Sequence, residues 1–184
     1  MPAAPAPSSL PLETLNTCPD AEFEERGAFL FESEATGRKL LATVRSARPF
    51  ASSRELHASI GHAVRGLGKE EKLAMLRDAN RLGVNRAAVT AKDAKQEHKR
   101  AGLDDLSEAE REHMRDLNER YEARFGWLFC LAIGNRTKDE IIAAFEERLR
   151  NEPEVEFDIC VDNHIQLAGL RIAKCIVEEP AAKL

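Results

Sequence analysis

The stretch SEAEREHMRDLNERYEARFG, residues 107–126, carries the clearest structural signal in the sequence. Ser107 and Glu110 form a capping box, in which each side chain accepts a hydrogen bond from the other residue's backbone N–H at the start of a helix. The apolar residues that follow recur every three or four positions, as on one face of an α-helix. They are Met114, Leu117, Tyr121 and Phe125. The stretch therefore predicts an amphipathic helix that ends at Gly126.

The sequence after this helix contains similar signals. WLFCLAI, residues 127–133, is a continuous apolar run that fits a buried strand and a buried extended segment equally well. Thr137 and Glu140 form a second capping box, and Pro153 opens the last and longest predicted helix. The residues of that helix expected to face the core are Val155, Phe157, Ile159, Cys160, Val161, Ile165, Leu167, Leu170 and Ile172.

Shorter helices are expected before residue 107. Cys18-Pro19 breaks the first segment into two short helices, and Gly37 is expected to end the turn that follows it. Ser52 or Ser53 can cap a later helix. The segments with helical periodicity are 11–31, 40–44, 52–66 and 69–78.

The composition agrees with a helical fold. Ala, Leu, Glu, Lys and Arg dominate a chain of 184 residues, which is enough for one domain with a core. No repeat period is present. We predict an all-α, single-domain helical bundle over residues 10–178, with a disordered Pro/Ala leader at 1–9 and a C-terminal tail at 179–184.

Charge and cysteine usage exclude several classes of function. The net charge is −5, from 27 basic and 32 acidic residues that are interspersed, so no basic stripe suggests a nucleic-acid partner. The longest apolar run is too short for a membrane span. No CxxC spacing suggests a zinc site or a disulfide framework, so a reducing compartment is expected. The four cysteines are Cys18, Cys130, Cys160 and Cys175.

The two ends of the chain bear on localisation. MPAAPAPSSLP has neither the charged start nor the apolar centre of a secretory signal. The chain stops at Ala182-Lys183-Leu184, which resembles the Ser-Lys-Leu type of peroxisomal address. We expect a cytoplasmic protein, or a peroxisomal one if the host is a eukaryote.

Several short phrases, in order and spacing, resemble the family of decarboxylases that act on 2-oxo-4-hydroxy-4-carboxy-5-ureidoimidazoline (OHCU), the last step from urate to allantoin. The resemblance spans about residues 10–178. The phrases are Leu15-Asn16, Arg48-Pro49-Phe50, Ala101-Gly102-Leu103, Leu117-Asn118 with Tyr121, Arg124-Phe125-Gly126, and NRTKDEI at 135–141.

The resemblance implies a fold and a chemistry. The family is an all-helical bundle, its members are often homodimers, and they use no metal or organic cofactor. Loss of CO2 leaves a carbanion or enediolate on a ring, so a placed acid must deliver a proton to one face. The substrate implied is a small ureide derived from purines, a polar anion that an arginine and backbone amides can hold.

This sequence departs from the family at its catalytic pair. The family's histidine aligns with Ala79 and the proline after it with Asn80. Its Ser-x-x-Glu-Gln phrase falls on residues 94–98, where Ala94 replaces the serine, Glu97 is retained and His98 replaces the glutamine. The resemblance therefore implies Glu97 and His98 as catalytic residues, with Asn80 and Ala94 at the substrate.

Two further segments are implied at the substrate. Arg171 matches an arginine that the family keeps facing its pocket, although pairing with a carboxylate on a neighbouring helix would explain it equally well. An arginine common after the apolar run is Gly134 here. The family contacts its ligand through the backbone of that run, which here comprises Phe129, Cys130, Leu131, Ala132 and Ile133.

Three interpretations of the missing histidine remain open from the sequence. In the first, decarboxylation is retained on OHCU or a modified, for example N-methylated, analogue, with His98 beside Glu97 delivering the proton. In the second, the pocket serves another lyase or isomerase reaction on a small carboxylic acid, with Glu97 as base. In the third, the chain is a non-catalytic paralogue that binds a ureide or a partner.

Overall fold

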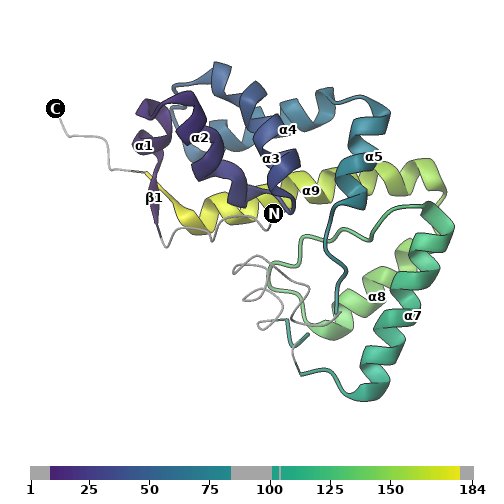
Figure 1. The fold of residues 1–184 in the computed structure, drawn as a ribbon. Helices are drawn as coiled ribbons and strands as arrows, with labels where there is room; N and C mark the ends of the chain where they lie inside the picture. Colours follow the sequence, from purple (N-terminus) through teal and green to yellow (C-terminus); the bar gives the residue numbers. More distant parts are fainter. Residues whose placement is uncertain (1–8, 84–100, 104, 179–184) are drawn as a thin grey trace.

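The computed structural model describes residues 9–83, 101–103 and 105–178 (Figure 1). Helices dominate the described part of the chain, which confirms the predicted all-α class. The α-helices are α1 (Leu12–Thr17), α2 (Asp20–Gly27), α3 (Glu34–Val44), α4 (Ser53–Gly66), α5 (Lys69–Arg77), α7 (Glu108–Phe125), α8 (Lys138–Arg148) and α9 (Pro153–Cys175). Two 3-10 turns, η1 (Ala28–Leu30) and η2 (Arg45–Ala47), flank α3.

The long helix α9 lies in the middle of the molecule (Figure 1). Helices α1 to α4 gather on one side of it, and α7 and α8 lie on the other. Among the described elements, α4 packs along α9 more extensively than any other pair. Beyond the C-terminal end of α9, β2 (Ile176–Val177) pairs in parallel with β1 (Leu10–Pro11), which ties the first described residues to the last. Side chains from both sides of α9 therefore share one core.

The predicted helix boundaries are confirmed where the sequence carried a cap. The Ser107 and Thr137 hydroxyls accept hydrogen bonds from the N–H groups of Glu110 and Glu140, whose carboxylates reach back to the cap. Gly126 ends α7 with a φ of +79°, a left-handed conformation that glycine adopts without strain. Local hydrogen bonding alone determines these ends.

Two details of the prediction are wrong. Gly37 lies inside α3 and ends no turn, because the helix begins directly after Ser33, whose hydroxyl caps it. Val155 and Leu170 are 54% and 39% exposed. Apolar residues at every second position, as at the start of α9, cannot all face inward on a helix that turns 100° per residue. The predicted leader and tail lie outside the described residues apart from Ser9, so the domain boundaries stay predictions.

The apolar run 127–133 is an extended segment that pairs with no strand among the described residues. Side chains satisfy two of its buried backbone groups. The N–H of Ala132 donates to Asn163 Oδ1 at 3.0 Å, and the carbonyl of Cys130 accepts from Arg148 Nη1 at 2.8 Å. The segment returns from the end of α7 beneath α9 to the start of α8 (Figure 1).

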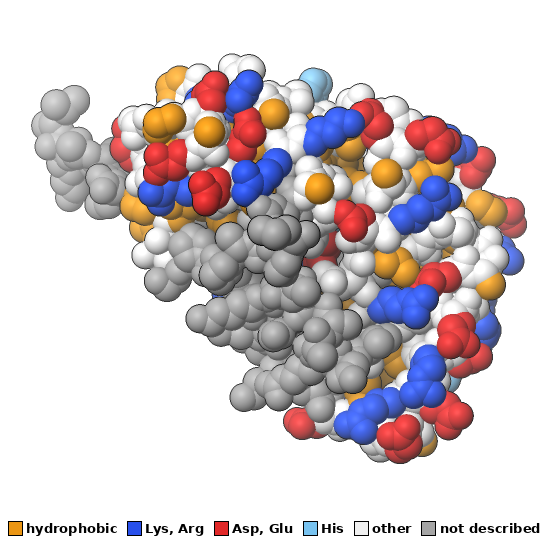
Figure 2. Space-filling model, viewed as in Figure 1, with side chains coloured by type: hydrophobic (Ala, Val, Ile, Leu, Met, Phe, Trp, Pro, Cys, Tyr) orange, Lys and Arg blue, Asp and Glu red, His pale blue; other side chains and the backbone are white. Residues whose placement is uncertain are grey.

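Acidic and basic side chains alternate over the face seen in Figure 2 without a large area of one sign. None of the described helices combines the length and the apolar character needed to cross a bilayer.

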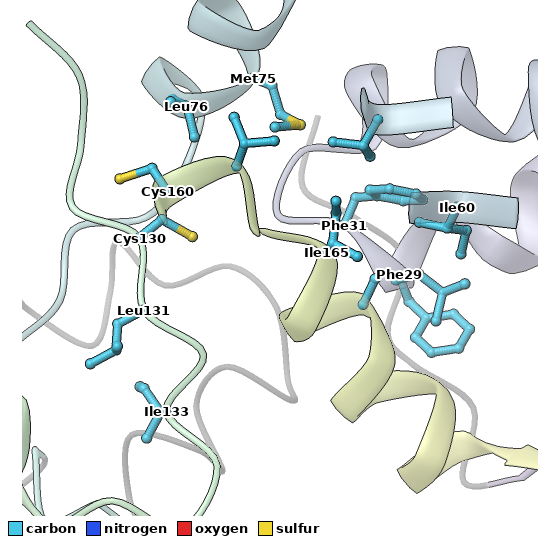
Figure 3. Close-up of a cluster of buried hydrophobic side chains, with 14 of the residues drawn as sticks. Phe29, Phe31, Ile60, Met75, Leu76, Cys130, Leu131, Ile133, Cys160 and Ile165 are labelled. Carbon is cyan, nitrogen blue, oxygen red and sulfur yellow. The ribbon is translucent and has the colours of Figure 1, made fainter. Parts of the chain in front are cut away.

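Ile60 of α4 and Ile165 of α9 both lie in the shared core (Figure 3). Ile60 is fully buried, so Ile60→Ala should leave a cavity and lower the free energy of unfolding by about 2–5 kcal/mol in urea titrations. The exposed Val155→Ala is the control and should change it by less than about 0.5 kcal/mol. Equal losses from the two variants would contradict this packing.

Candidate functional site

Five polar side chains from separate parts of the chain meet in the interior. We call Glu32, Asn80, Cys130, His164 and Arg171 the buried polar cluster. The first follows η1, the second follows α5, and the third belongs to the extended segment 127–133. The last two are seven residues apart on α9, close to two helical turns, so they share one face of it.

Glu32 connects the cluster. The Asn80 amide Nδ2 and the Arg171 guanidinium Nη2 each donate a hydrogen bond to its carboxylate. Burial by itself would raise the pKa of Glu32, but the Arg171 charge and the Asn80 hydrogen bond outweigh it and hold that pKa below its ordinary value. Glu32 therefore stays ionised, as one half of a buried ion pair.

Arg171 is 1% exposed. Its Nη1 donates to the carbonyl of Phe29 at 3.1 Å, and its Nη2 to Glu32. This agrees with the alternative that Arg171 pairs with a carboxylate, although the partner comes from the turn after η1 and not from a helix. Its Nε has no hydrogen-bond partner among the described residues. A buried guanidinium N–H without a partner is costly, so this donor is available for a further hydrogen bond.

His164 is buried on α9, and its Nδ1 lies 3.0 Å from the Cys130 Sγ. Burial lowers the pKa of His164 to about 4; the Glu32 carboxylate opposes the shift and the Arg171 charge adds to it. The imidazole is therefore neutral at pH 7. Burial likewise raises the pKa of the Cys130 thiol, so this cysteine is a thiol rather than a nucleophilic thiolate.

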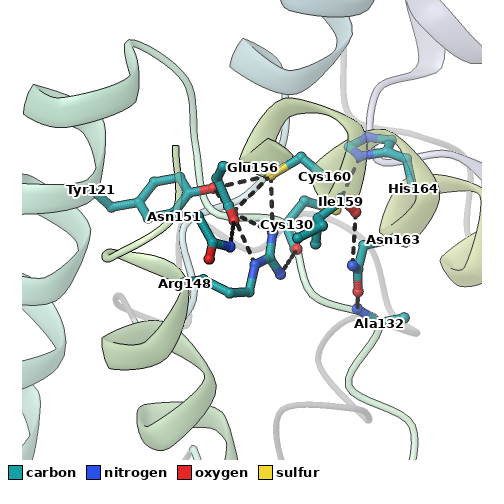
Figure 4. A network of polar contacts seen from close by, with 10 residues as sticks. All are labelled: Tyr121, Cys130, Ala132, Arg148, Asn151, Glu156, Ile159, Cys160, Asn163 and His164. Carbon is teal, nitrogen blue, oxygen red and sulfur yellow. Dashed lines mark hydrogen bonds and ion pairs between the residues drawn. The ribbon is translucent and has the colours of Figure 1, made fainter. Parts of the chain in front are cut away.

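A second polar network holds the extended segment 127–133 in place (Figure 4). Arg148 donates through Nε and Nη2 to Glu156 Oε1, at 2.9 and 2.7 Å, and through Nη1 to the Cys130 carbonyl. The Tyr121 hydroxyl donates to the same carboxylate oxygen and lies 3.0 Å from Cys160 Sγ. Cys130 and Cys160 are buried, as predicted, but both belong to polar networks besides filling space.

The predicted site residues fall into three groups. Asn80, Cys130 and Arg171 belong to the buried polar cluster, and Ala79 lies beside it, half-buried. The other members of the predicted ligand-contacting run, all buried along the extended segment, are Phe129, Leu131, Ala132 and Ile133. Ala94, Glu97 and His98 lie outside the described residues, so their predicted roles stay predictions.

A separate cavity of about 390 Å³ opens on another face of α9. Gln166, Gly169 and Leu170 contribute to its wall, and by helical geometry these positions point away from His164 and Arg171. Its other lining residues are His57, Ala132, Gly134 and Arg136. It meets the predicted site only at Ala132, so the buried polar cluster is the better candidate.

The sequence analysis missed Glu32 and His164. His164 carried a signal, because it interrupts the apolar pattern of α9 at a position where the helix faces the core. Glu32 carried none, since its partners are 48 and 139 residues away along the chain. Among the residues described, no group of three or more His, Cys, Asp or Glu side chains is arranged to hold a metal ion.

The buried His164 makes stability depend on pH. Its pKa is about 4 in the folded state against 6.5 for an ordinary histidine, so the unfolded chain binds the proton first as the pH falls. The contribution is fully present above pH 6.5 and is lost on the way down to pH 4. Between pH 7 and pH 5 the wild type should lose about 2 kcal/mol through this group.

Urea unfolding at the two pH values tests this. In His164→Gln the free energy of unfolding should decrease by about 2 kcal/mol less between pH 7 and pH 5 than in wild type. His113→Gln, a change at a more exposed histidine, should show the same decrease as wild type. An equal loss of unfolding free energy in wild type and His164→Gln would contradict the role of His164 in the pH dependence.

The Arg148–Glu156 pair should be essential for stability. Glu156→Gln leaves the Arg148 guanidinium buried without its anion, which should lower the free energy of unfolding by about 3 kcal/mol or more. Glu154→Gln is the matched control on the same helix. Glu154 is exposed, and its carboxylate forms a weak surface ion pair with Lys69 at 3.8 Å, so this variant should be as stable as wild type. A Glu156→Gln variant as stable as this control would contradict the role of the pair.

Comparison with known proteins places the chain in a family. The sequence model of the family described as OHCU decarboxylase matches residues 16–173. The chain is 32% identical to a 2-oxo-4-hydroxy-4-carboxy-5-ureidoimidazoline decarboxylase of Haloferax volcanii over 165 residues, which cover 90% of this chain and 95% of that protein. It is 34% identical to the protein of the same name in Amia calva over 143 residues, or 76% and 81% of the two chains.

The fold is similar to a solved structure as well. A crystal structure of (S)-allantoin synthase superposes with a TM-score of 0.69 at 24% identity, over 90% of this chain and 54% of that chain. At this level of identity the likeness concerns the fold alone. With the family match over most of its length, the chain belongs to the OHCU decarboxylase family and so to the carboxy-lyases.

Proposed function

We propose that this protein decarboxylates OHCU, or a modified analogue such as an N-methylated one, to an (S)-allantoin-type product in urate catabolism. The observation that carries the proposal is the buried polar cluster. Asn80, Cys130 and Arg171, which the family resemblance places at the substrate, belong to one cluster through Glu32 and His164. Desolvating the Glu32–Arg171 pair is costly, which supports a role for it beyond packing.

The cluster supplies groups that suit a cyclic ureide carboxylate. Arg171 Nε–H is a buried donor without a partner among the described residues, and such a donor suits a carboxylate or ureido oxygen. The hydrogen bond to Glu32 fixes the Asn80 amide, whose Oδ1 is an acceptor that suits a ring N–H. The extended segment, held by Arg148 and Asn163, offers backbone groups in a fixed position.

The substitutions at 79 and 94 favour a less polar ring. An alanine in place of a histidine, and another in place of a serine, enlarges the site and removes two polar groups. A polar group left unpaired against a methylated ring nitrogen would cost about 1–3 kcal/mol, so its removal suits such a substrate. Glu97 and His98 are proposed to act at the reacting atoms, with His98 as the proton donor.

Two alternative functions would use the same site. One is another lyase or isomerase reaction on a small carboxylic acid, and the other is a ureide-binding paralogue without activity, which the alanine at position 79 favours. A homodimer without a cofactor is proposed for either case, as in the family resemblance.

A turnover assay separates these functions. Substrate is generated in situ, and circular dichroism follows the chiral product, with plain and N-methylated OHCU compared against their spontaneous decay. We expect the protein to accelerate at least one of them and to produce one enantiomer. Decay at the spontaneous rate for both rings, with a folded protein, would contradict decarboxylation and favour the binding paralogue.

His98→Gln should abolish turnover in the same assay, because glutamine cannot donate the proton that histidine can. His113→Gln, at a more exposed histidine that contacts Glu146 at 3.3 Å, is the control and should turn over like wild type. Retained turnover in His98→Gln would exclude His98 as the donor.

A further inference from the structure

Decarboxylation of a carboxylate consumes a proton. The C–C bond breaks, its electron pair stays on the substrate, and a proton must be added: R–COO⁻ + H⁺ gives R–H + CO2. The side chain that donates this proton must therefore take up another one from water before the next turnover. A site closed to solvent needs a group that gains this proton no later than substrate binding.

His164 is placed to be that group. It lies in the buried polar cluster with Asn80 and Arg171, and it is the described histidine most deeply buried. Within the described part of the chain, its ring is hydrogen-bonded through Nδ1 to the Cys130 Sγ at 3.0 Å. A neutral thiol can donate to Nδ1 or accept from it, so the imidazole can change its protonation state without losing this contact.

We propose that His164 takes up a proton when the anionic substrate enters the buried polar cluster and holds it in reserve for the proton donor at the reacting atoms. The inference rests on the proposed function. It assigns to a residue of α9 the proton balance that alanine at position 79 cannot provide, whereas the proposed His98 acts at the reacting atoms.

The charges around His164 explain why binding would trigger the change. Among the described residues, the charged or titratable groups facing it are the Glu32 carboxylate, the Arg171 guanidinium and the Cys130 thiol; Cys160 and Arg148 lie one step further, beside Cys130. Burial keeps His164 neutral in the free protein, and the opposed charges of Glu32 and Arg171 act on it in opposite directions. A bound carboxylate adds one uncompensated negative charge, which favours the imidazolium.

The experiment follows the imidazole signals of the wild-type protein by NMR from pH 4 to pH 8. It is run without ligand, with hydantoin-5-acetate as a stable anionic ring, and with neutral allantoin. His164 is identified as the histidine signal that survives each of four single changes, namely His57→Gln, His62→Gln, His98→Gln and His113→Gln. We expect its midpoint near 4 in the free protein to rise by about 3 units with hydantoin-5-acetate, enough to protonate much of it at pH 7, and to stay unchanged with allantoin.

Two results would overturn the proposal: a midpoint that the bound anion leaves unchanged, or an equal rise with neutral allantoin. A pH profile of turnover gives a second readout if hydantoin-5-acetate does not bind. His164→Gln should then lose about 10²-fold in kcat at pH 8 and less at pH 6, where protons are more available. A constant ratio to wild type across this range would mean a structural role and would also overturn the proposal.

The outcomes separate this inference from the proposed function. A wild type that fails to accelerate decarboxylation contradicts the function whatever His164 does. A wild type that turns over, with a His164 that never changes protonation on anion binding, contradicts only the inference.

Discussion

Glu32 and Arg171 form an ion pair in the interior, and three segments of the chain meet through it. The turn after η1 supplies the carboxylate, α9 supplies the guanidinium, and Asn80 after α5 donates to the same carboxylate. Removing two charges from water is expensive, and the geometry repays that cost only while both partners are present. The ion pair thereby fixes the relative positions of the residues from which a substrate site can be built.

The alanine at position 79 has to be understood within this arrangement. A decarboxylase needs a place for an anion and a source of one proton per turnover, and these need not be one residue. The fixed Asn80 amide suits the anion, as does Arg171, whose Nε has no partner among the residues that the structure describes. For the proton, we propose His98 as the donor at the reacting atoms and the buried His164 as the group that holds its replacement. Other residues can therefore still meet the two requirements of the reaction when the histidine at position 79 is replaced by alanine.

Local signals determined how much of the structure could be predicted. The capping boxes at Ser107 and Thr137 and the glycine at 126 set helix ends through contacts within a few residues, so the sequence alone predicted them. The run 127–133 remained ambiguous because its backbone is satisfied by Asn163 and Arg148, which come from distant helices. Of the cluster, Asn80, Cys130 and Arg171 were named as site residues through the family resemblance. Glu32 was missed because its role arises only when the chain is folded.

The most direct test of this account is a titration with (S)-allantoin, the proposed product, followed through side-chain amide signals in an NMR spectrum. Asn80 belongs to the buried polar cluster, and Gln166 lines the separate cavity on the other face of α9. One spectrum therefore reports on both places. If the cluster is the substrate site, the Asn80 amide shifts saturably and the Gln166 amide does not. A saturable shift of Gln166 with an unchanged Asn80 would place the ligand in the cavity and contradict the account.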